Sequence, residues 1–471
     1  MTCDEAVRYL LALGRELASP QQARVAKFDL ANTGILTDRL GHPERTYPTA
    51  HIAGTNGKGS TAAMLASILG AAGLRAGLYT SPHLERIQER IRLDGREISD
   101  QEFAAAFDRI RAAIEDLLAK GRLAAHPTFF ECLTAMAFDY FARPGGNAAS
   151  ERAEFAVFET GMGGRLDATN VISPEVAVIT QIAFDHENYL GHSIEEIAGE
   201  KAGIIKHGAW VVSAAEHPAA RDVIRRRAKE QKARLVEIEE RFEVKNPRTE
   251  RNHGGTRFEA RDKESGRTIE LTLPLAGRFQ VRNALAALAA ARLLGERGFP
   301  TDDAAIARGI AEVRWPGRLE RVGERPTVYV DGTHNPAGAR ELAAFWDEQF
   351  PGVAIHLVYG TLRDKAVDEI CGLLFPRAAS VILTEPHQSR ALKAETLADM
   401  MRHLAPYCEI VRDPAAALER AVQLAAPEDA VFATGSLYLV ADYRRGWERI
   451  SQQRGLRAAT QQTPADARPR I

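Results

Sequence analysis

A glycine-rich segment near the start of this 471-residue chain constrains its fold more than any other stretch. Residues 47–61 read YPTAHIAGTNGKGST, which predicts a short strand, a tight turn and a helix that begins near Gly59. Such a turn points backbone N–H groups inward, and the positive end of the following helix adds to their field. The segment therefore predicts a phosphate site; the plainer alternative is a glycine-rich turn that merely starts a helix.

The predicted phosphate loop departs from the usual spacing. A strict P-loop has four residues between its first glycine and its Gly-Lys pair, and Ser or Thr directly follows the lysine. Here only two residues intervene and Gly59 separates Lys58 from Ser60, so the match is to a variant. Lys58 would place a positive charge on the outer phosphates, and a hydroxyl of the first helical turn would reach a magnesium ion. The residues predicted to bind nucleotide here are Gly54, Thr55, Asn56, Gly57, Lys58, Gly59, Ser60 and Thr61.

Composition excludes several classes of protein. Hydrophobic residues make up 45% of the chain and charged residues 26%, as in ordinary globular proteins. A formal net charge of −2 gives no global attraction to nucleic acid or anionic lipid. We find no signal peptide and no run of about 18 apolar residues that would span a membrane. The four cysteines are far apart and form no CxxC pair, so we expect a cytoplasmic protein.

Alternating strand and helix patterns predict two α/β units joined by a linker. Residues 1–313 would hold the phosphate loop on a mainly parallel sheet that is covered on both faces. Within them, residues 241–274 alternate polar and apolar side chains around DKESG, which predicts an antiparallel hairpin insert. We expect a hinge linker over 314–318, a smaller Rossmann-like α/β unit over 319–450, and a frayed tail over 451–471.

Three residues of the first unit are candidates for chemistry. Glu159 and His186 each follow a predicted strand, at the edge of the sheet where the phosphate loop also lies, and could hold Mg²⁺ beside nucleotide phosphates. A helix cap and a structural hydrogen bond are the alternatives, while Asp185 would either orient the His186 ring or be a surface charge. Lys201 lies in a helix of small residues, where burial would lower its pKa. The sequence alone favours a solvated lysine beside Glu200.

The second unit offers one candidate motif. Residues 331–336 read DGTHNP and follow a predicted strand, so Asp331 and His334 would face a cleft. A tight Asx turn ending in Pro336 would produce the same letters. Arg318, next to the linker, could reach a phosphate group.

Together these motifs resemble the folylpolyglutamate synthase and dihydrofolate synthase family, within the Mur-type amide ligases. The resemblance extends from the first predicted helix to Tyr443. It implies an α/β, Mur-ligase-like fold with an N-terminal P-loop ATPase domain and a smaller Rossmann-like C-terminal domain. The motifs that carry it are HIAGTNGKGS at 51–60, TSPHL at 80–84, GMGGRLDATN at 161–170, DH at 185–186, EKAGI at 200–204, WPGRLE at 315–320, DGTHNP at 331–336 and TGSLY at 434–438.

The resemblance implies a role for each matching residue. Lys58 and the loop amides would hold the phosphates of ATP, and Ser81 and Glu159 would bind one Mg²⁺. His186 would bind a second Mg²⁺ near Glu159, and Lys201, which is commonly carboxylated on its amine in this family, would act as a carboxylate-like ligand. Nucleotide contacts are also implied for Asn283, Arg318 and Asp331, with His334 close to the phosphates; the implied catalytic set is Lys58, Lys201 and His334.

The reaction that the resemblance implies is the ATP-dependent addition of L-glutamate to dihydropteroate, to reduced folates, or to both, through an acyl phosphate. The sequence leaves open whether both activities are present or only polyglutamylation of folates. A peptidoglycan-precursor ligase of the same architecture and a non-catalytic nucleotide-binding scaffold are the alternatives, and the extra Gly59 disfavours the first. The partners would be small molecules rather than nucleic acid or membrane, and members of the family are usually monomers.

Overall fold

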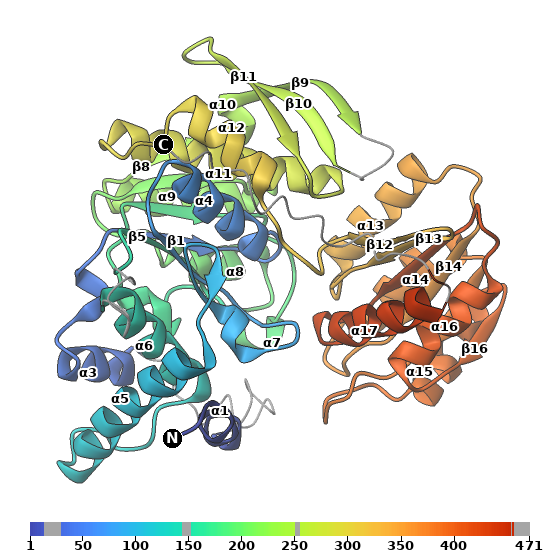
Figure 1. Ribbon diagram of the computed structural model, residues 1–471. Coiled ribbons are helices and arrows are strands. Elements are labelled where there is room, and N and C mark those ends of the chain that lie inside the picture. Colours follow the sequence, from blue (N-terminus) through green and yellow to red (C-terminus); the bar gives the residue numbers. More distant parts are fainter. Residues whose placement is uncertain (14–29, 144–151, 250–254, 454, 456–471) are drawn as a thin grey trace, which may run out of the picture. The chain divides into compact units, whose positions relative to one another are not determined.

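The computed structural model divides the chain into two compact units, Met1–Trp315 and Pro316–Ile471 (Figure 1). The structure describes residues 1–13, 30–143, 152–249, 255–453 and 455. The tail expected over 451–471 falls almost wholly outside the described residues. The last described helix continues to Gln453, three residues beyond the expected end of the second unit.

A large, mainly parallel sheet forms the centre of the first unit. Its strands are β1 (Thr49–Ala53), β2 (Ala76–Tyr79), β3 (Ile91–Leu93), β4 (Arg96–Glu97), β5 (Phe155–Glu159), β6 (Val176–Ile179), β7 (Trp210–Ser213) and β8 (Arg234–Glu237). Within the described residues they lie in the order β4-β3-β2-β5-β1-β6-β7-β8. β1 pairs in parallel with both β5 and β6, whereas β3 and β4 form an antiparallel edge. The carboxyl ends of β1, β5 and β6 therefore meet at one edge of the sheet.

Helices cover both faces of this sheet. Those that the structure describes in this unit are α1 (Cys3–Ala12), α3 (Ala31–Arg39), α4 (Lys58–Ala71), α5 (Asp100–Ala119), α6 (Phe129–Ala142), α7 (Glu187–Leu190), α8 (Ile194–Ala202), α9 (Pro218–Glu230), α10 (Ile238–Arg241), α11 (Arg278–Glu296) and α12 (Asp303–Glu312). α4, α11 and α12 pack together on one face, and α5 and α6 lie on the other (Figure 1). The phosphate-loop helix α4 begins at Lys58, one residue before the predicted start.

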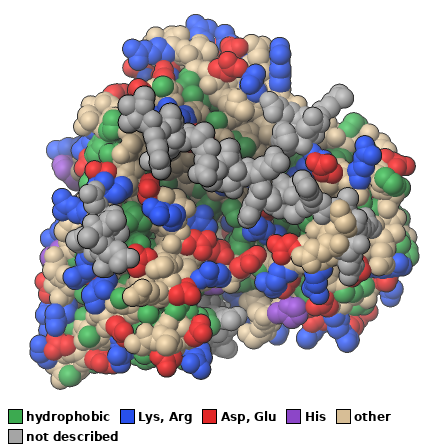
Figure 2. All heavy atoms as spheres, in the orientation of Figure 1, with side chains coloured by type: hydrophobic (Ala, Val, Ile, Leu, Met, Phe, Trp, Pro, Cys, Tyr) green, Lys and Arg blue, Asp and Glu red, His purple; other side chains and the backbone are tan. Residues whose placement is uncertain are grey.

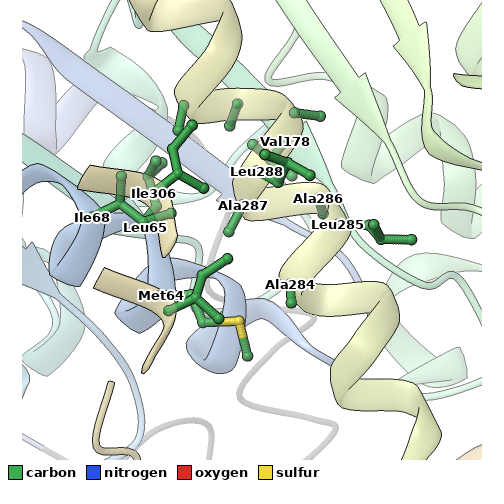
Figure 3. Close-up of a cluster of buried hydrophobic side chains, with 14 of the residues drawn as sticks. Met64, Leu65, Ile68, Val178, Ala284, Leu285, Ala286, Ala287, Leu288 and Ile306 are labelled. Carbon is green, nitrogen blue, oxygen red and sulfur yellow. The ribbon is translucent and has the colours of Figure 1, made fainter. Parts of the chain in front are cut away.

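The buried core explains why the strands read as continuous apolar runs. Along β5, Phe155 and Val157 belong to the cluster under α4 and α11, while Ala156 and Phe158 belong to the cluster under α5 and α6. Both faces of the strand are thus dry, as parallel strands require. Figure 3 shows the first cluster, in which Met64, Leu65 and Ile68 of α4 pack towards Ala284, Leu285, Ala286, Ala287 and Leu288 of α11 and Ile306 of α12.

The insert predicted as a hairpin over 241–274 contains an additional strand. β10 (Thr256–Asp262) and β11 (Thr268–Leu273) are antiparallel as expected, but β9 (Phe242–Thr249) pairs with the other side of β10. The prediction missed β9 because most of its side chains are exposed and Pro247 interrupts it.

The second unit contains a six-stranded sheet within the described residues, in the order β12-β13-β17-β14-β15-β16. Its strands are β12 (Glu320–Glu324), β13 (Thr327–Val330), β14 (Ile355–Tyr359), β15 (Ser380–Leu383), β16 (Cys408–Ile410) and β17 (Ala430–Thr434). Its helices are α13 (Pro336–Gln349), α14 (Val367–Leu374), α15 (Ala394–Met401), α16 (Pro414–Leu424) and α17 (Leu437–Gln453). All neighbouring strands are parallel except β12 and β13. β12 and β16, short or bulged strands at the two edges, were not predicted.

The surface carries charges of both signs. The chain has 61 Lys and Arg residues against 63 Asp and Glu residues, and Figure 2 shows the two kinds interspersed over the face in view. Among the described helices, none combines the length and apolar character that crossing a membrane requires.

Candidate active site

The phosphate loop, residues 54–57, joins the end of β1 to the start of α4. Gly57 occupies the N-cap position with a φ of 88° and supplies no side-chain cap, which suits a helix start whose N–H groups serve an anion. The segment after β6 holds the loop in place. Thr55 N donates to Gln181 O at 2.7 Å, and Thr55 Oγ1 donates to Ala183 O at 3.0 Å.

Side chains from other elements lie against two of the loop glycines. A Cβ at Gly54 would lie 1.8 Å from Thr180 Oγ1, and one at Gly57 would lie 2.2 Å from Asn283 Oδ1. Both positions also have positive φ, so neither admits another residue without strain. Thr180 Oγ1 donates to Asn56 O at 2.7 Å.

Two lysines converge on this loop. Lys58 Nζ donates to Gly54 O at 3.1 Å and to Thr55 O at 3.2 Å. Lys201, from α8, donates to the same Gly54 oxygen at 2.8 Å. Only 3% of Lys201 is exposed; burial, followed by the charge of Lys58, lowers its pKa to about 7. The reading of Lys201 as a solvated residue is therefore wrong.

The neighbours of Lys201 explain how a lysine can occupy this position. Glu200 does not pair with it but with Arg165, whose Nη2 lies 2.8 Å from Glu200 Oε1. Asp185 and Asp167 act in the opposite direction to burial, because their charges favour the protonated amine. With its pKa near 7, Lys201 exchanges between its neutral and charged forms close to neutral pH.

Glu159 is the last residue of β5. This strand pairs with β1, which leads directly into the phosphate loop. The Glu159 side chain is buried, with the residue 3% exposed, and its Oε2 accepts a hydrogen bond of 3.0 Å from Ser81 N. Ser81 follows β2, the strand on the other side of β5. The topology thus brings together two residues that the sequence analysis placed on one ion.

His186 and Asp185 lie between β6 and α7. His186 has a φ of 54°, its N donates to Asp185 Oδ1 at 2.9 Å, and its Nε2 lies 3.9 Å from the same oxygen. The Asp185 side chain is 9% exposed and that of His186 38%, so Asp185 is not an ordinary surface charge. In the part of the chain that the structure describes, no three His, Cys, Asp or Glu side chains group to hold a metal ion.

α11 also reaches the phosphate loop, which the sequence analysis recognised only in part. Asn283 Nδ2 donates to Gln280 Oε1 at 2.9 Å, and Gln280 Nε2 donates to Ser60 Oγ at 3.2 Å. Gln280 is fully buried and was not predicted. A glutamine and an asparagine three residues apart, facing one side of an alanine-rich helix, were the available signal.

A buried hydrogen-bonded chain lies beneath the loop that follows Glu159, and it too was missed. Asp167 Oδ2 accepts from Met162 N at 3.0 Å, and Thr169 Oγ1 donates to Asp167 Oδ1 at 2.5 Å. The Thr169 hydroxyl is also 2.8 Å from His51 Nε2 and must accept there, which makes Nε2 the protonated nitrogen. Burial lowers the pKa of His51 to about 3, so the ring is neutral.

In the second unit, the DGTHNP motif forms the tight turn that was the alternative interpretation. Asp331 Oδ1 accepts from Thr333 N and Oδ2 accepts from Leu319 N, both at 2.8 Å. His334 Nδ1 lies 2.8 Å from Gly332 O. Both side chains therefore contribute to local structure.

Arg318 is close to this turn. A Cβ at Gly332 would lie 2.7 Å from Arg318 Nη1, so the guanidinium group covers that glycine. The carboxyl end of β13, in the second unit, is thus the place where Arg318, Asp331 and His334 lie close together.

The residues present fit a nucleotide and a divalent cation. The uncapped start of α4 and the glycine turn offer N–H donors, and Lys58 offers a positive charge. Thr61 Oγ1 is buried without a hydrogen-bond partner among the described residues, and it lies in the first turn of the same helix. One buried carboxylate, Glu159, suits a magnesium ion that takes most of its ligands from phosphate oxygens and water.

Comparison with known proteins finds two Mur ligase domains in the chain. The Mur ligase middle domain matches residues 146–291, and the Mur ligase, glutamate ligase domain matches residues 317–437. The dihydrofolate synthase/folylpolyglutamate synthase of Bacillus subtilis (strain 168) is 37% identical over 413 residues, which cover 87% of this chain and 93% of the relative.

Solved structures of similar proteins have the same fold. The folylpolyglutamate synthase of Mycobacterium tuberculosis complexed with ADP has a TM-score of 0.83 and 34% identity, covering 94% of this chain and 98% of that chain. Escherichia coli FolC in complex with DHPP and ADP has a TM-score of 0.81 and 30% identity, covering 95% and 98%. The chain therefore belongs to the dihydrofolate synthase/folylpolyglutamate synthase family of Mur-type, ATP-dependent ligases.

Proposed function

We propose that this protein joins the amino group of L-glutamate to a carboxylate of dihydropteroate, of reduced folates, or of both, with ATP as the phosphate donor. The observation that carries the proposal is the convergence of Lys58 and Lys201 on the carbonyl oxygen of Gly54, within the phosphate loop. This convergence places a fixed positive charge and an amine of lowered pKa beside the predicted phosphate site. Relatives named for both activities support the choice of substrates.

The chemistry needs no nucleophile from the protein. A substrate carboxylate oxygen attacks the γ-phosphorus of ATP, the bond to the β-γ bridging oxygen breaks, and ADP leaves. The amine of glutamate then attacks the acyl carbon, phosphate leaves with the C–O bond electrons, and the amine loses a proton. Lys58 and the N–H groups of the first turn of α4 would stabilise the charge on the transferred phosphoryl group.

We propose two Mg²⁺ sites for the same reaction. Ser81 and Glu159 would hold the first ion, while Glu159, His186 and a carboxylated Lys201 would hold the second. Bound Mg²⁺ would neutralise phosphate charge and align the reacting oxygens. Support for the first site comes from the buried Glu159 carboxylate and its hydrogen bond from Ser81 N.

We also propose that Lys201 is carboxylated, and its lowered pKa supports this. The neutral amine adds to the carbon of CO₂, and the resulting carbamate is an anion after one proton is released. Because the pKa of Lys201 is lowered to about 7, neutral amine is present near neutral pH and the addition can proceed there. Removal of CO₂ should lower activity, and bicarbonate should restore it; mass spectrometry at Lys201 supplies an independent readout.

The remaining predicted residues are part of the same proposal. Asn283, Arg318 and Asp331 would bind the nucleotide, and His334 would lie near its phosphates. We also propose that residues 314–318 act as a hinge, since the boundary between the two compact units falls after Trp315. The protein would act as a monomer on small molecules.

Glutamate-dependent ADP release tests the proposal directly. The purified protein with Mg·ATP is assayed in parallel with dihydropteroate and with tetrahydrofolate. Release with both establishes two activities, and release with tetrahydrofolate alone establishes polyglutamylation only. Release with neither overturns the proposal; stimulation by UDP-linked muropeptides would then favour a peptidoglycan-precursor ligase, and slow hydrolysis insensitive to every acceptor would favour a scaffold.

A further inference from the structure

Trp315, the last residue of the first unit, packs against the first turn of the phosphate-loop helix. A Cβ at Gly59 would lie 2.8 Å from the Cζ2 atom of its indole ring and 3.3 Å from its Nε1. The Arg92 guanidinium group lies over the ring, 5.6 Å from the ring centroid. The buried Nε1–H has no hydrogen-bond partner among the described residues, so packing fixes the ring.

This contact explains the glycine that makes the phosphate loop a variant. Gly59 is in the first turn of α4 and its φ is not positive, so its backbone conformation is open to any residue. Alanine is the better helix former at such a position. Among the described surroundings, the indole ring is what a side chain at residue 59 would meet first. The glycine between Lys58 and Ser60 thus makes room for Trp315.

We infer that Trp315 is a positioning residue for nucleotide binding: its ring sets the first turn of α4 and links that turn to the segment that enters the second unit. A ligand that moves the N-terminal turn of α4 must also move the ring or compress the contact. Trp315 lies within the proposed hinge and residue 316 begins the second unit, so a movement of the ring would act on the hinge itself. This inference rests on the proposed function, since it needs a nucleotide at the loop.

A double-mutant cycle between Gly59 and Trp315 tests the contact, with the dissociation constant of ADP as the readout. Gly59→Ala should weaken ADP binding about tenfold, because the added methyl group displaces the helix start from the ring. In a Trp315→Ala background the same substitution should cost less than about twofold, because the obstacle is gone. Trp315→Leu, which keeps apolar bulk but lacks the six-membered ring, replaces Trp315→Ala if that variant does not fold.

The same helix supplies a matched control. Gly70 is also in α4, and a Cβ there would meet nothing within 4 Å, so Gly70→Ala should leave ADP binding unchanged. A Gly59→Ala defect of equal size in both Trp315 backgrounds would overturn the inference while leaving the proposed function intact. Failure of the unsubstituted protein to bind ADP would overturn both.

Intrinsic fluorescence gives a second readout that a purely structural contact would not move. ADP should change the tryptophan emission of the full-length protein, and Trp315→Phe should remove most of that change. Trp210→Phe is the control, because Trp210 is also partly buried and has the Arg234 guanidinium group 4.6 Å from its ring centroid. Trp210 is the first residue of β7, so it lies at the amino ends of the parallel strands, whereas the phosphate loop lies at their carboxyl ends. An ADP signal that survives in Trp315→Phe contradicts the inference.

Discussion

Lys58 and Lys201 come from different helices, yet both donate hydrogen bonds to the carbonyl oxygen of Gly54, at 3.1 and 2.8 Å. Burial of the Lys201 amine, followed by the positive charge of Lys58 beside it, lowers the pKa of Lys201 to about 7. For the proposed reaction, one arrangement would therefore supply both the charged lysine for phosphate and the neutral amine for carboxylation.

Replacing Lys58 by alanine should reduce glutamate-dependent ADP release by at least about a hundredfold, because the loop loses its fixed positive charge beside the γ-phosphate. The fold should persist, since the hydrogen bonds from Lys58 Nζ to Gly54 O and Thr55 O lie within its own loop. Steady-state kinetics and thermal unfolding measure the two effects. Unaltered turnover in Lys58→Ala would remove Lys58 from the mechanism.

Replacing Glu159 by glutamine should leave the hydrogen bond from Ser81 N in place, because the amide oxygen can accept it. The substitution removes one negative charge, so we expect a loss of turnover of about a hundredfold and a higher Mg²⁺ concentration for half-maximal rate. Initial rates over a Mg²⁺ titration provide the measurement. A rate that falls with no change in the Mg²⁺ dependence would argue against a metal-binding role.

Lys201 should make stability depend on pH above neutrality. Its pKa of about 7 in the folded protein is below the ordinary value of 10.5, so between these values the unfolded chain binds the extra proton. Its contribution to the free energy of unfolding then rises with pH across this window, by up to about 1.4 kcal/mol per pH unit. Urea unfolding in CO₂-free buffer should show a smaller slope for Lys201→Met. The control is Lys120→Met, at an exposed site that follows α5; an equal slope in the Lys201 variant and the unsubstituted protein would contradict the prediction.

His51 should make the free energy of unfolding depend on pH below neutrality. Its pKa of about 3 is below the ordinary value of 6.5, so the unfolded chain takes up a proton that the folded protein refuses. The contribution of His51 to stability is complete above pH 6.5 and falls as the pH drops towards 3. His51→Gln, which can still donate to Thr169, should flatten the loss of stability between pH 6.5 and 4. His207→Gln, at an exposed position, should not.

The sequence was informative about the fold wherever a strand was buried on both faces. β5 and β6 could be recognised from runs of apolar residues, and the parallel sheet followed from their alternation with helices. β9 and β16 were missed because exposed edge strands have little apolar periodicity. Propensity and pattern describe burial, and of the β9 side chains only that of Phe242 belongs to the buried core.

The candidate site was predictable in its residue types but not in its contacts. Gly54, Lys58 and Glu159 could be singled out because each follows or ends a predicted strand. The role of Gln280 depends on Ser60, which is distant in sequence, so the only local signal was its spacing from Asn283. Asp167 bonds within its own loop, to Met162 N and Thr169 Oγ1, and the sequence pattern does not show those bonds. For Lys201, the residues nearby in sequence suggested exposure, and only the packing of α8 against the loop shows that it is buried.

Each glycine of the phosphate loop and its first helical turn is matched by a side chain from somewhere else: Gly54 by Thr180, Gly57 by Asn283 and Gly59 by Trp315. The conformation of this loop is therefore imposed from outside its own sequence. Grafting residues 54–61 onto another α/β scaffold would transfer the sequence of the loop without its conformation. An engineer who wanted this nucleotide site elsewhere would have to transplant the three partners with it.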